Sequence, residues 1–192
     1  DKRIVVADLG IDKLIVYDVT YDGGRPQMKF ASEASVAPGY GPRHTLFSRN
    51  GKRLYVLCEM GSRIYVFDYD TKSGGLQYRQ DLSTLPENIL ENCCAHLQLS
   101  PDENYLYASN RGHDSIAIFR VCKEDGTLEY LQTQPAGGKT PRHFSIDPTG
   151  RFLITANQDS DLVCCFRRDF NTGFLTQVSQ VVIPSPVHIA FL

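Results

Sequence analysis

The sequence repeats itself about every fifty residues, and this repeat constrains the fold more than any other feature. Four histidines occupy equivalent places in successive units: His44, His96, His143 and His188. An aromatic anchor recurs in the same phase: Tyr17, Phe67, Phe119 and Phe166. The histidine spacings are 52, 47 and 45 residues, and the aromatic spacings are 50, 52 and 47 residues. Two independent anchors in phase indicate an architecture of stacked, similar units.

Each unit has the pattern of four short strands. In the third unit we expect strands over 96–100, 105–110, 115–121 and 128–132. The strands are rich in β-branched and aromatic residues, the turns carry Asn-Gly, Asp-Gly and Pro-Thr-Gly, and only 86–92 could form a helical turn. Four strands in about fifty residues is typical of a β-propeller blade, and the absence of Trp argues against the WD40 type. We therefore predict an all-β protein, a β-propeller of four-stranded blades.

The chain contains about four blade equivalents. We expect one partial propeller domain over 1–192, with blade units at about 1–38, 39–92, 93–139 and 140–186 and a closing first strand at 187–192. By phase, the sequence begins with the second strand of one blade and ends within the first strand of another. Either a small four-bladed ring or part of a larger propeller has this pattern, and we favour the larger propeller. Open blade edges would then pair with missing N-terminal blades or drive self-association.

Composition excludes several classes of function. The chain carries 20 basic and 22 acidic residues, well mixed, so we expect no nucleic-acid-binding surface. We also expect no membrane segment, because no apolar run approaches the ~20 residues of a membrane helix. The six cysteines match no zinc-ligand spacing, and a chain of this size does not need disulfides. We expect reduced thiols, a cytoplasmic location and no metal site.

Repeat arithmetic gathers charged and histidine side chains at one edge of the blades. The first two strands of a blade are antiparallel, so the start of one lies beside the end of the other. A hairpin centred near Gly51 places Arg43 opposite Glu59. Equivalent hairpins pair His96 with Arg111, and Arg142 with Gln158. If the first strand is innermost, this edge surrounds one mouth of the central channel, where ligand sites are expected. The residues predicted there are Arg43, His44, Glu59, His96, Arg111, Arg142, His143, Gln158 and Asp8.

One column of this edge changes character from unit to unit. Its members are equivalent by phase: Leu9, Glu59, Arg111 and Gln158. A residue with a repeated structural role should be similar in every unit, so a changing column indicates a binding or catalytic site. The recurring histidines leave two interpretations open, because each could contact a ligand or hydrogen-bond to the neighbouring blade. We do not expect them to share a metal, since strands of separate blades rarely converge to ligand distances of about 2.1 Å.

Several segments resemble a known family. They are V-A-D-L-G-I-D-K-L-I-V-Y at 6–17, G-Y-G-P-R-H at 39–44, S-P-D-E-N-Y-L-Y-A-S-N-R-G-H at 100–113, T-P-R-H-F-S-I-D-P-T-G-R-F-L-I-T-A-N-Q at 140–158 and S-P-V-H-I at 185–189. They are similar to the seven-bladed β-propeller lactonases, a family that includes cycloisomerase-type 6-phosphogluconolactonases and 3-carboxy-cis,cis-muconate lactonizing enzymes. The resemblance covers essentially the whole chain. It implies that this is the C-terminal part of a seven-bladed ring, and that an earlier strand with a catalytic histidine is absent here.

The resemblance also implies roles for individual residues. The catalytic positions of the family match Arg43, Glu59 and Arg111, although Cys58 precedes Glu59 where family members often have Asn. Family substrates are anionic sugar lactones or muconates, and arginine suits carboxylate or phosphate recognition. Glu59 or a histidine would act as the base, and the arginines would bind the anion and the developing oxyanion. The other residues predicted at the mouth would then bind the substrate, and no cofactor is required.

Three hypotheses follow for the function. The first is a cofactor-independent lactonase acting on a small anionic substrate such as 6-phosphogluconolactone. The second is a muconate-type lactonizing cycloisomerase, which differs by its substrate alone. The third is a non-catalytic propeller that serves as a binding scaffold, because one fold hosts many functions.

Overall fold

The computed structural model describes residues 3–86 and 91–192. Within these ranges the chain forms β-strands and one short 3-10 turn, Gln158–Ser160. The helical turn considered for 86–92 falls on residues 87–90, which lie outside the described residues. The expectation of an all-β protein is confirmed.

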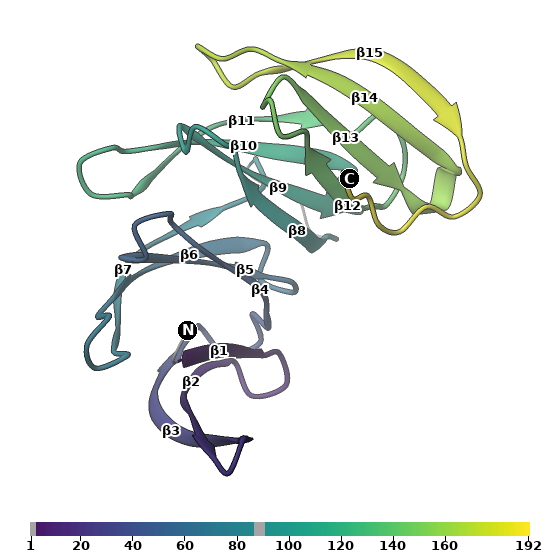
Figure 1. Ribbon diagram of the computed structural model, residues 1–192. Coiled ribbons are helices and arrows are strands. Elements are labelled where there is room, and N and C mark those ends of the chain that lie inside the picture. Colours follow the sequence, from purple (N-terminus) through teal and green to yellow (C-terminus); the bar gives the residue numbers. More distant parts are fainter. Residues whose placement is uncertain (1–2, 87–90) are drawn as a thin grey trace.

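The strands form four antiparallel sheets that follow one another along an arc in chain order (Figure 1). The first sheet has three strands: β1 (Arg3–Asp8), β2 (Lys13–Asp22) and β3 (Arg25–Ser35). The second has four: β4 (Pro42–Phe47), β5 (Arg53–Cys58), β6 (Arg63–Tyr69) and β7 (Leu76–Ser83). The third contains β8 (Cys93–Leu99), β9 (Tyr105–Arg111), β10 (Ser115–Val121) and β11 (Leu128–Pro135). The fourth contains β12 (Pro141–Ile146), β13 (Phe152–Asn157), β14 (Leu162–Arg168) and β15 (Leu175–Val182).

The aromatic anchor marks the same irregularity in every sheet. The two outer strands of each sheet shift register by one residue, and the shift falls immediately before the anchor: Val16/Tyr17, Val66/Phe67, Ile118/Phe119 and Cys165/Phe166. A bulge increases the local twist of a strand. The recurrence of the anchor therefore reflects a repeated bend in the outer part of each sheet.

The hydrophobic core lies between neighbouring sheets. Strand β5 illustrates this, because its side chains alternate between two clusters. Tyr55 and Leu57 pack toward the third sheet, whereas Leu54, Val56 and Cys58 pack toward the first. A further cluster joins the third and fourth sheets through Tyr107 and other buried side chains. The two middle sheets are thus covered on both faces.

The outer faces of the first and last sheets carry large apolar side chains that remain exposed. They include Ile4, Val6, Met28, Phe30 and Val181. No helix in the described part of the chain is long and apolar enough to cross a membrane.

The expected closing strand at 187–192 differs in the structure, where residues 183–192 have no strand pairing. The segment runs beside β12, since the backbone N–H of Ile189 donates to Nδ1 of His143 over 3.2 Å. An innermost strand is held by backbone hydrogen bonds to a second strand. Among the described residues no second strand lies beside this segment, and β1, a second strand by phase, pairs only with β2.

Candidate active site

The first strands of the second, third and fourth sheets each bulge near their beginning. The register shifts between Pro42 and His44 in β4 and between Pro141 and His143 in β12, so Arg43 and Arg142 are the extra residues. In β8 the shift lies between Cys94 and Leu97. Bulges commonly re-aim side chains next to binding sites. The same irregularity therefore turns three strand beginnings toward one place.

These bulges correct the predicted register. Strand pairing sets Pro42 opposite Cys58 and Cys93 opposite Arg111, so the predicted direct pairing of His96 with Arg111 is wrong. Arg142 likewise does not pair with Gln158, since Gln158 donates its backbone N–H to the carbonyl of Thr140 over 3.0 Å. The predicted pairing takes one residue of the first strand opposite one residue of the second, whereas a bulge places two residues of one strand opposite a single residue of the other.

Arg43 and Glu59 nevertheless meet through their side chains. Nε of Arg43 lies 3.0 Å from Oε2 of Glu59, and Nη2 of Arg111 contacts the other carboxylate oxygen. The three side chains are mostly buried, with exposed fractions of 16–21%. Glu59 is thus held between two guanidinium groups, one from the second sheet and one from the third.

Backbone carbonyls of β8 orient both arginines. Nη1 of Arg43 donates to the carbonyl of Ala95 over 2.7 Å, and Nη2 of Arg111 donates to that of Cys94 over 3.0 Å. Burial lowers the pKa of Arg43, and the Glu59 carboxylate opposes this effect. The sequence carried no signal for these contacts, because any residue can offer a carbonyl.

The recurring histidines form one continuous row beside this cluster. Nδ1 of His96 lies 3.2 Å from Nδ1 of His44. The ring centroids of His96 and His143 are 4.1 Å apart, and those of His143 and His188 are 4.2 Å apart. Burial lowers the pKa of His44 and of His143 to about 4 and that of His96 to about 3. These three rings are therefore neutral near pH 7.

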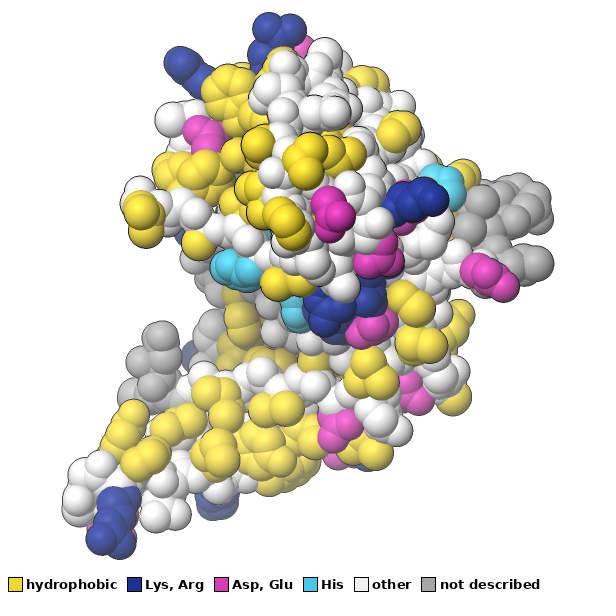
Figure 2. Space-filling model, turned by 90° about the vertical axis from the view of Figure 1, so that its right-hand side faces the viewer, with side chains coloured by type: hydrophobic (Ala, Val, Ile, Leu, Met, Phe, Trp, Pro, Cys, Tyr) yellow, Lys and Arg dark blue, Asp and Glu magenta, His cyan; other side chains and the backbone are white. Residues whose placement is uncertain are grey.

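A cavity of about 650 Å³ opens along this row. Its lining includes Arg43 and the four histidines, with apolar and small polar side chains between them. Figure 2 shows basic, acidic and histidine side chains gathered near the middle of one face. A concave site with a few converging polar groups is the usual form of a small-molecule site.

The structure does not bring every predicted residue into the cluster. Asp8 accepts a hydrogen bond from Gly10 over 3.0 Å within its own turn. Arg142 is exposed, and the part of the chain that the structure describes offers it no ion pair. Oε1 of Gln158 is buried and has no hydrogen-bond partner among the described residues.

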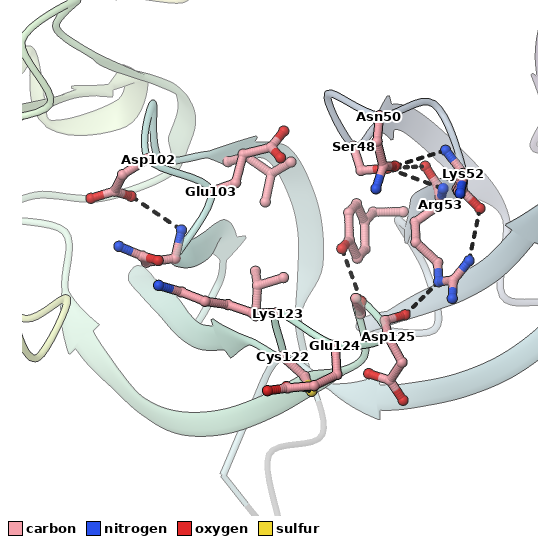
Figure 3. A pocket seen from close by; sticks show the side chains of 15 residues that line it. Ser48, Asn50, Lys52, Arg53, Asp102, Glu103, Cys122, Lys123, Glu124 and Asp125 are labelled. Atoms are coloured by element: carbon pink, nitrogen blue, oxygen red, sulfur yellow. Dashed lines mark hydrogen bonds between the residues drawn. The ribbon is translucent and has the colours of Figure 1, made fainter.

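A second cavity, of about 550 Å³, lies between the second and third sheets (Figure 3). It is lined by the turns that follow β4, β8 and β10, and these turns contain many charged residues. Several of its polar groups hydrogen-bond to the fold itself. Arg53 donates to the carbonyl of Asp125, Tyr55 donates to that of Gly126 over 2.9 Å, and Ser48 donates to Asn50 over 2.8 Å (Figure 3). The residues that line this cavity connect the second and third sheets.

The cysteines are all free thiols, as the sequence predicts. Burial raises the pKa of Cys58 to about 12 and that of Cys94 to about 11. Both thiols are therefore protonated and unreactive near pH 7. Cys58 precedes Glu59 without acting as a nucleophile.

Comparison with known proteins identifies the family to which this fold belongs. The model of the family described as "Lactonase, 7-bladed beta-propeller" matches residues 1–191. The chain belongs to this family, which supports a larger propeller rather than a four-bladed ring.

Individual relatives agree with this assignment. The 6-phosphogluconolactonase of Bacillus subtilis is 36% identical over 98% of this chain and 54% of its own length. The structure of the Pseudomonas aeruginosa periplasmic gluconolactonase has a TM-score of 0.90 at 31% identity, covering 97% of this chain and 53% of that chain. A putative 6-phosphogluconolactonase from Bacteroides fragilis has a TM-score of 0.88 at 33% identity, with coverages of 97% and 53%. The chain spans about half the length of the relatives that it matches.

Proposed function

We propose that the protein hydrolyses a sugar-acid lactone, of the 6-phosphogluconolactone type, without a cofactor. The observation that carries this proposal is the Glu59 carboxylate held between Arg43 and Arg111, next to the cavity that Arg43 and the four histidines line. The names of the relatives support it, as they include 6-phosphogluconolactonase and gluconolactonase.

The cluster supplies what the reaction needs. In hydrolysis, the oxygen of water bonds to the lactone carbonyl carbon, and the ring C–O bond breaks. Glu59 would take one proton from the attacking water and return it to the alkoxide that leaves. A guanidinium would stabilise the oxyanion that forms on the carbonyl oxygen. The substrate anion would accept hydrogen bonds from the arginines that Glu59 now holds, and this exchange would free the carboxylate for its role as a base.

The remaining predictions about the mouth enter as parts of this proposal. In this proposal the substrate-binding residues predicted from the sequence would contact the sugar or its anionic group: His44, His96, Arg142, His143, Gln158 and Asp8. The cytoplasmic location expected from the cysteines remains a prediction, because the P. aeruginosa relative is described as periplasmic.

Replacement of Glu59 tests the proposal directly. In the intact protein, we expect Glu59→Gln to lower kcat/KM for lactone hydrolysis by about 10²- to 10⁴-fold, the usual contribution of a general base. Glu129→Gln is the matched control, because Glu129 forms only an exposed ion pair with Arg120. Equal rates for the wild type and the Glu59 variant would contradict the assignment. Turnover of a muconate-type lactone alone would favour the cycloisomerase, and binding without turnover would favour a scaffold.

A further inference from the structure

The histidine next to Arg43 has both of its ring nitrogens engaged. Nη1 of Arg43 lies within hydrogen-bond distance of Nε2 of His44 and farther, at 3.4 Å, from Nδ1. On the other side of the ring, Nδ1 of His44 faces Nδ1 of His96 over 3.2 Å. His44 therefore bridges the arginine of the second sheet and the histidine row.

The nearer contact of Arg43 selects one arrangement of protons. A guanidinium N–H can only donate, so with Nε2 of His44 as its acceptor that nitrogen carries no proton. A neutral imidazole then carries its proton on Nδ1, and this group donates to His96. Nδ1 of His96 is therefore an acceptor, and the proton of His96 is on Nε2. His143 has the same tautomer, because its Nδ1 accepts from the backbone N–H of Ile189.

The surroundings keep His44 neutral. The charged groups around it are Arg43, Glu59 and Arg111, and two of these three are cations. The neighbouring ring, His96, is packed between His44 and His143, with centroid distances of 5.4 and 4.1 Å. A protonated His44 would lose its acceptor for Arg43 and would stand beside two positive charges.

We propose that His44, as the neutral Nδ1–H tautomer, is a positioning residue that orients the guanidinium of Arg43, with His96 as its hydrogen-bond acceptor. Arg43 sits at a bulge, where the regular strand pairing does not hold it. Its guanidinium direction is set by Glu59, by the carbonyl of Ala95 and by His44. The importance of this arrangement for catalysis rests on the proposed lactonase function. The tautomers themselves do not depend on it.

The first experiment observes the tautomers directly. Long-range ¹H–¹⁵N spectra of the intact protein at pH 7 distinguish the two neutral tautomers from the imidazolium of each histidine. We expect the Nδ1–H form for His44 and the Nε2–H form for His96 and His143. A His44 ring found as the Nε2–H tautomer or as the imidazolium would overturn the proposal.

The second experiment separates the two contacts of His44. In His44→Gln the side-chain oxygen reaches the place of Nε2 and can accept from Arg43. In His44→Asn the amide reaches only the place of Nδ1, which lies 3.2 Å from Nδ1 of His96 and farther, 3.4 Å, from Nη1 of Arg43. We expect the Nε–H resonance of Arg43, hydrogen-bonded to Glu59, to keep its shift and slow exchange in the Gln variant and to lose both in the Asn variant. Equal behaviour of the two variants would refute the positioning role.

Kinetics extend this comparison. In lactone hydrolysis, we expect kcat to fall about 10- to 100-fold in His44→Asn and less than threefold in His44→Gln, with KM little changed in both. His113→Gln is the control, because His113 lies in a loop and contacts Ser115. If the wild type hydrolyses no lactone, the proposed function fails, while the spectra still decide the role of His44.

Discussion

The two ends of the blade junctions differ in how regularly their contacts repeat. At the turn end, side chains from the start of one blade's second strand donate to backbone carbonyls of the next blade, and this contact recurs. Arg3 donates to Thr71, Arg53 to Asp125 and Tyr105 to Asn171. At the mouth, the column that changes between units holds Leu9, Glu59, Arg111 and Gln158, and one junction among the described residues joins two arginines to a carboxylate. Repetition accompanies structural contacts, and variation accompanies the candidate site.

The acid stability of the protein should separate the two ends most strongly. His44, His96 and His143 have pKa values of about 4, 3 and 4 in the folded protein, below the ordinary value of 6.5. The unfolded chain therefore binds protons first as the pH falls. We expect the free energy of unfolding to be highest above pH 6.5 and to decrease steadily toward pH 4. Urea unfolding at a series of pH values measures this.

The turn end should contribute little over that range. Hydrogen bonds from Thr127 lower the pKa of Asp125 to about 2, so its stabilising effect is complete above pH 4 and is lost only below it. A His96→Phe variant should reduce the slope between pH 6.5 and 4, because one of the three histidines no longer titrates, whereas Asp125→Asn should not. A slope unchanged in the His96 variant would assign the acid sensitivity to other groups.

Exchanging arginine for lysine should lower activity at the mouth and stability at the turn end. Arg111→Lys replaces a fork that reaches Glu59 and a carbonyl together with a single point charge. We expect kcat/KM to fall about 100-fold, the upper range for a hydrogen bond between charged groups. Arg53→Lys should instead lower stability by about 1 kcal/mol and leave kcat unchanged. Comparable activity losses in both variants would mean that the turn end also belongs to the site.

Arg168 should be the most important single residue for stability at the turn end. Its side chain is fully buried, donates to the carbonyl of Gly150 over 2.6 Å and pairs with Asp102 at 2.9 Å. Arg168→Met keeps much of the volume and removes both contacts. We expect a loss of about 2 kcal/mol, measured by urea unfolding, because Asp102 and a buried carbonyl lose their donors. An unchanged urea midpoint would show that the ion pair between Arg168 and Asp102 only compensates for the free-energy cost of removing the two charges from water.

The smallest expected effect comes from one hydroxyl group. Tyr107 is fully buried, and its hydroxyl donates to the carbonyl of Gly173 over 2.7 Å, joining the third and fourth sheets. Tyr107→Phe should lower the free energy of unfolding by about 1 kcal/mol, since it leaves that carbonyl without a donor. The kinetic constants should not change. A loss of activity would instead show that the contact between Tyr107 and Gly173 affects the candidate active site.

Sequence patterns predicted the sheets well because they depend on local alternation and on a repeat. The strand expected over 115–121 has those bounds in the structure, and the strand expected over 128–132 extends to Pro135. The predicted hairpin pairing also places Arg43, Glu59 and Arg111 at one edge of the blades, and in the structure their side chains are in contact. The same arithmetic misplaced His96 relative to Arg111, because a bulge adds a residue without a recognisable sequence signature.

The sequence by itself determined the repeat, the blade pattern and the column in which Glu59 and Arg111 stand, because strand alternation and repeat period are properties of neighbouring residues along the chain. Tertiary structure alone decided that Glu59 bridges two arginines from different sheets, that carbonyls of β8 orient them, and that His44 links Arg43 to a row of neutral imidazoles. Three of these contacts join residues 52 positions apart: Arg43 with Ala95, His44 with His96, and Glu59 with Arg111. They depend on bulges, burial and proton positions, which only the packed blades define.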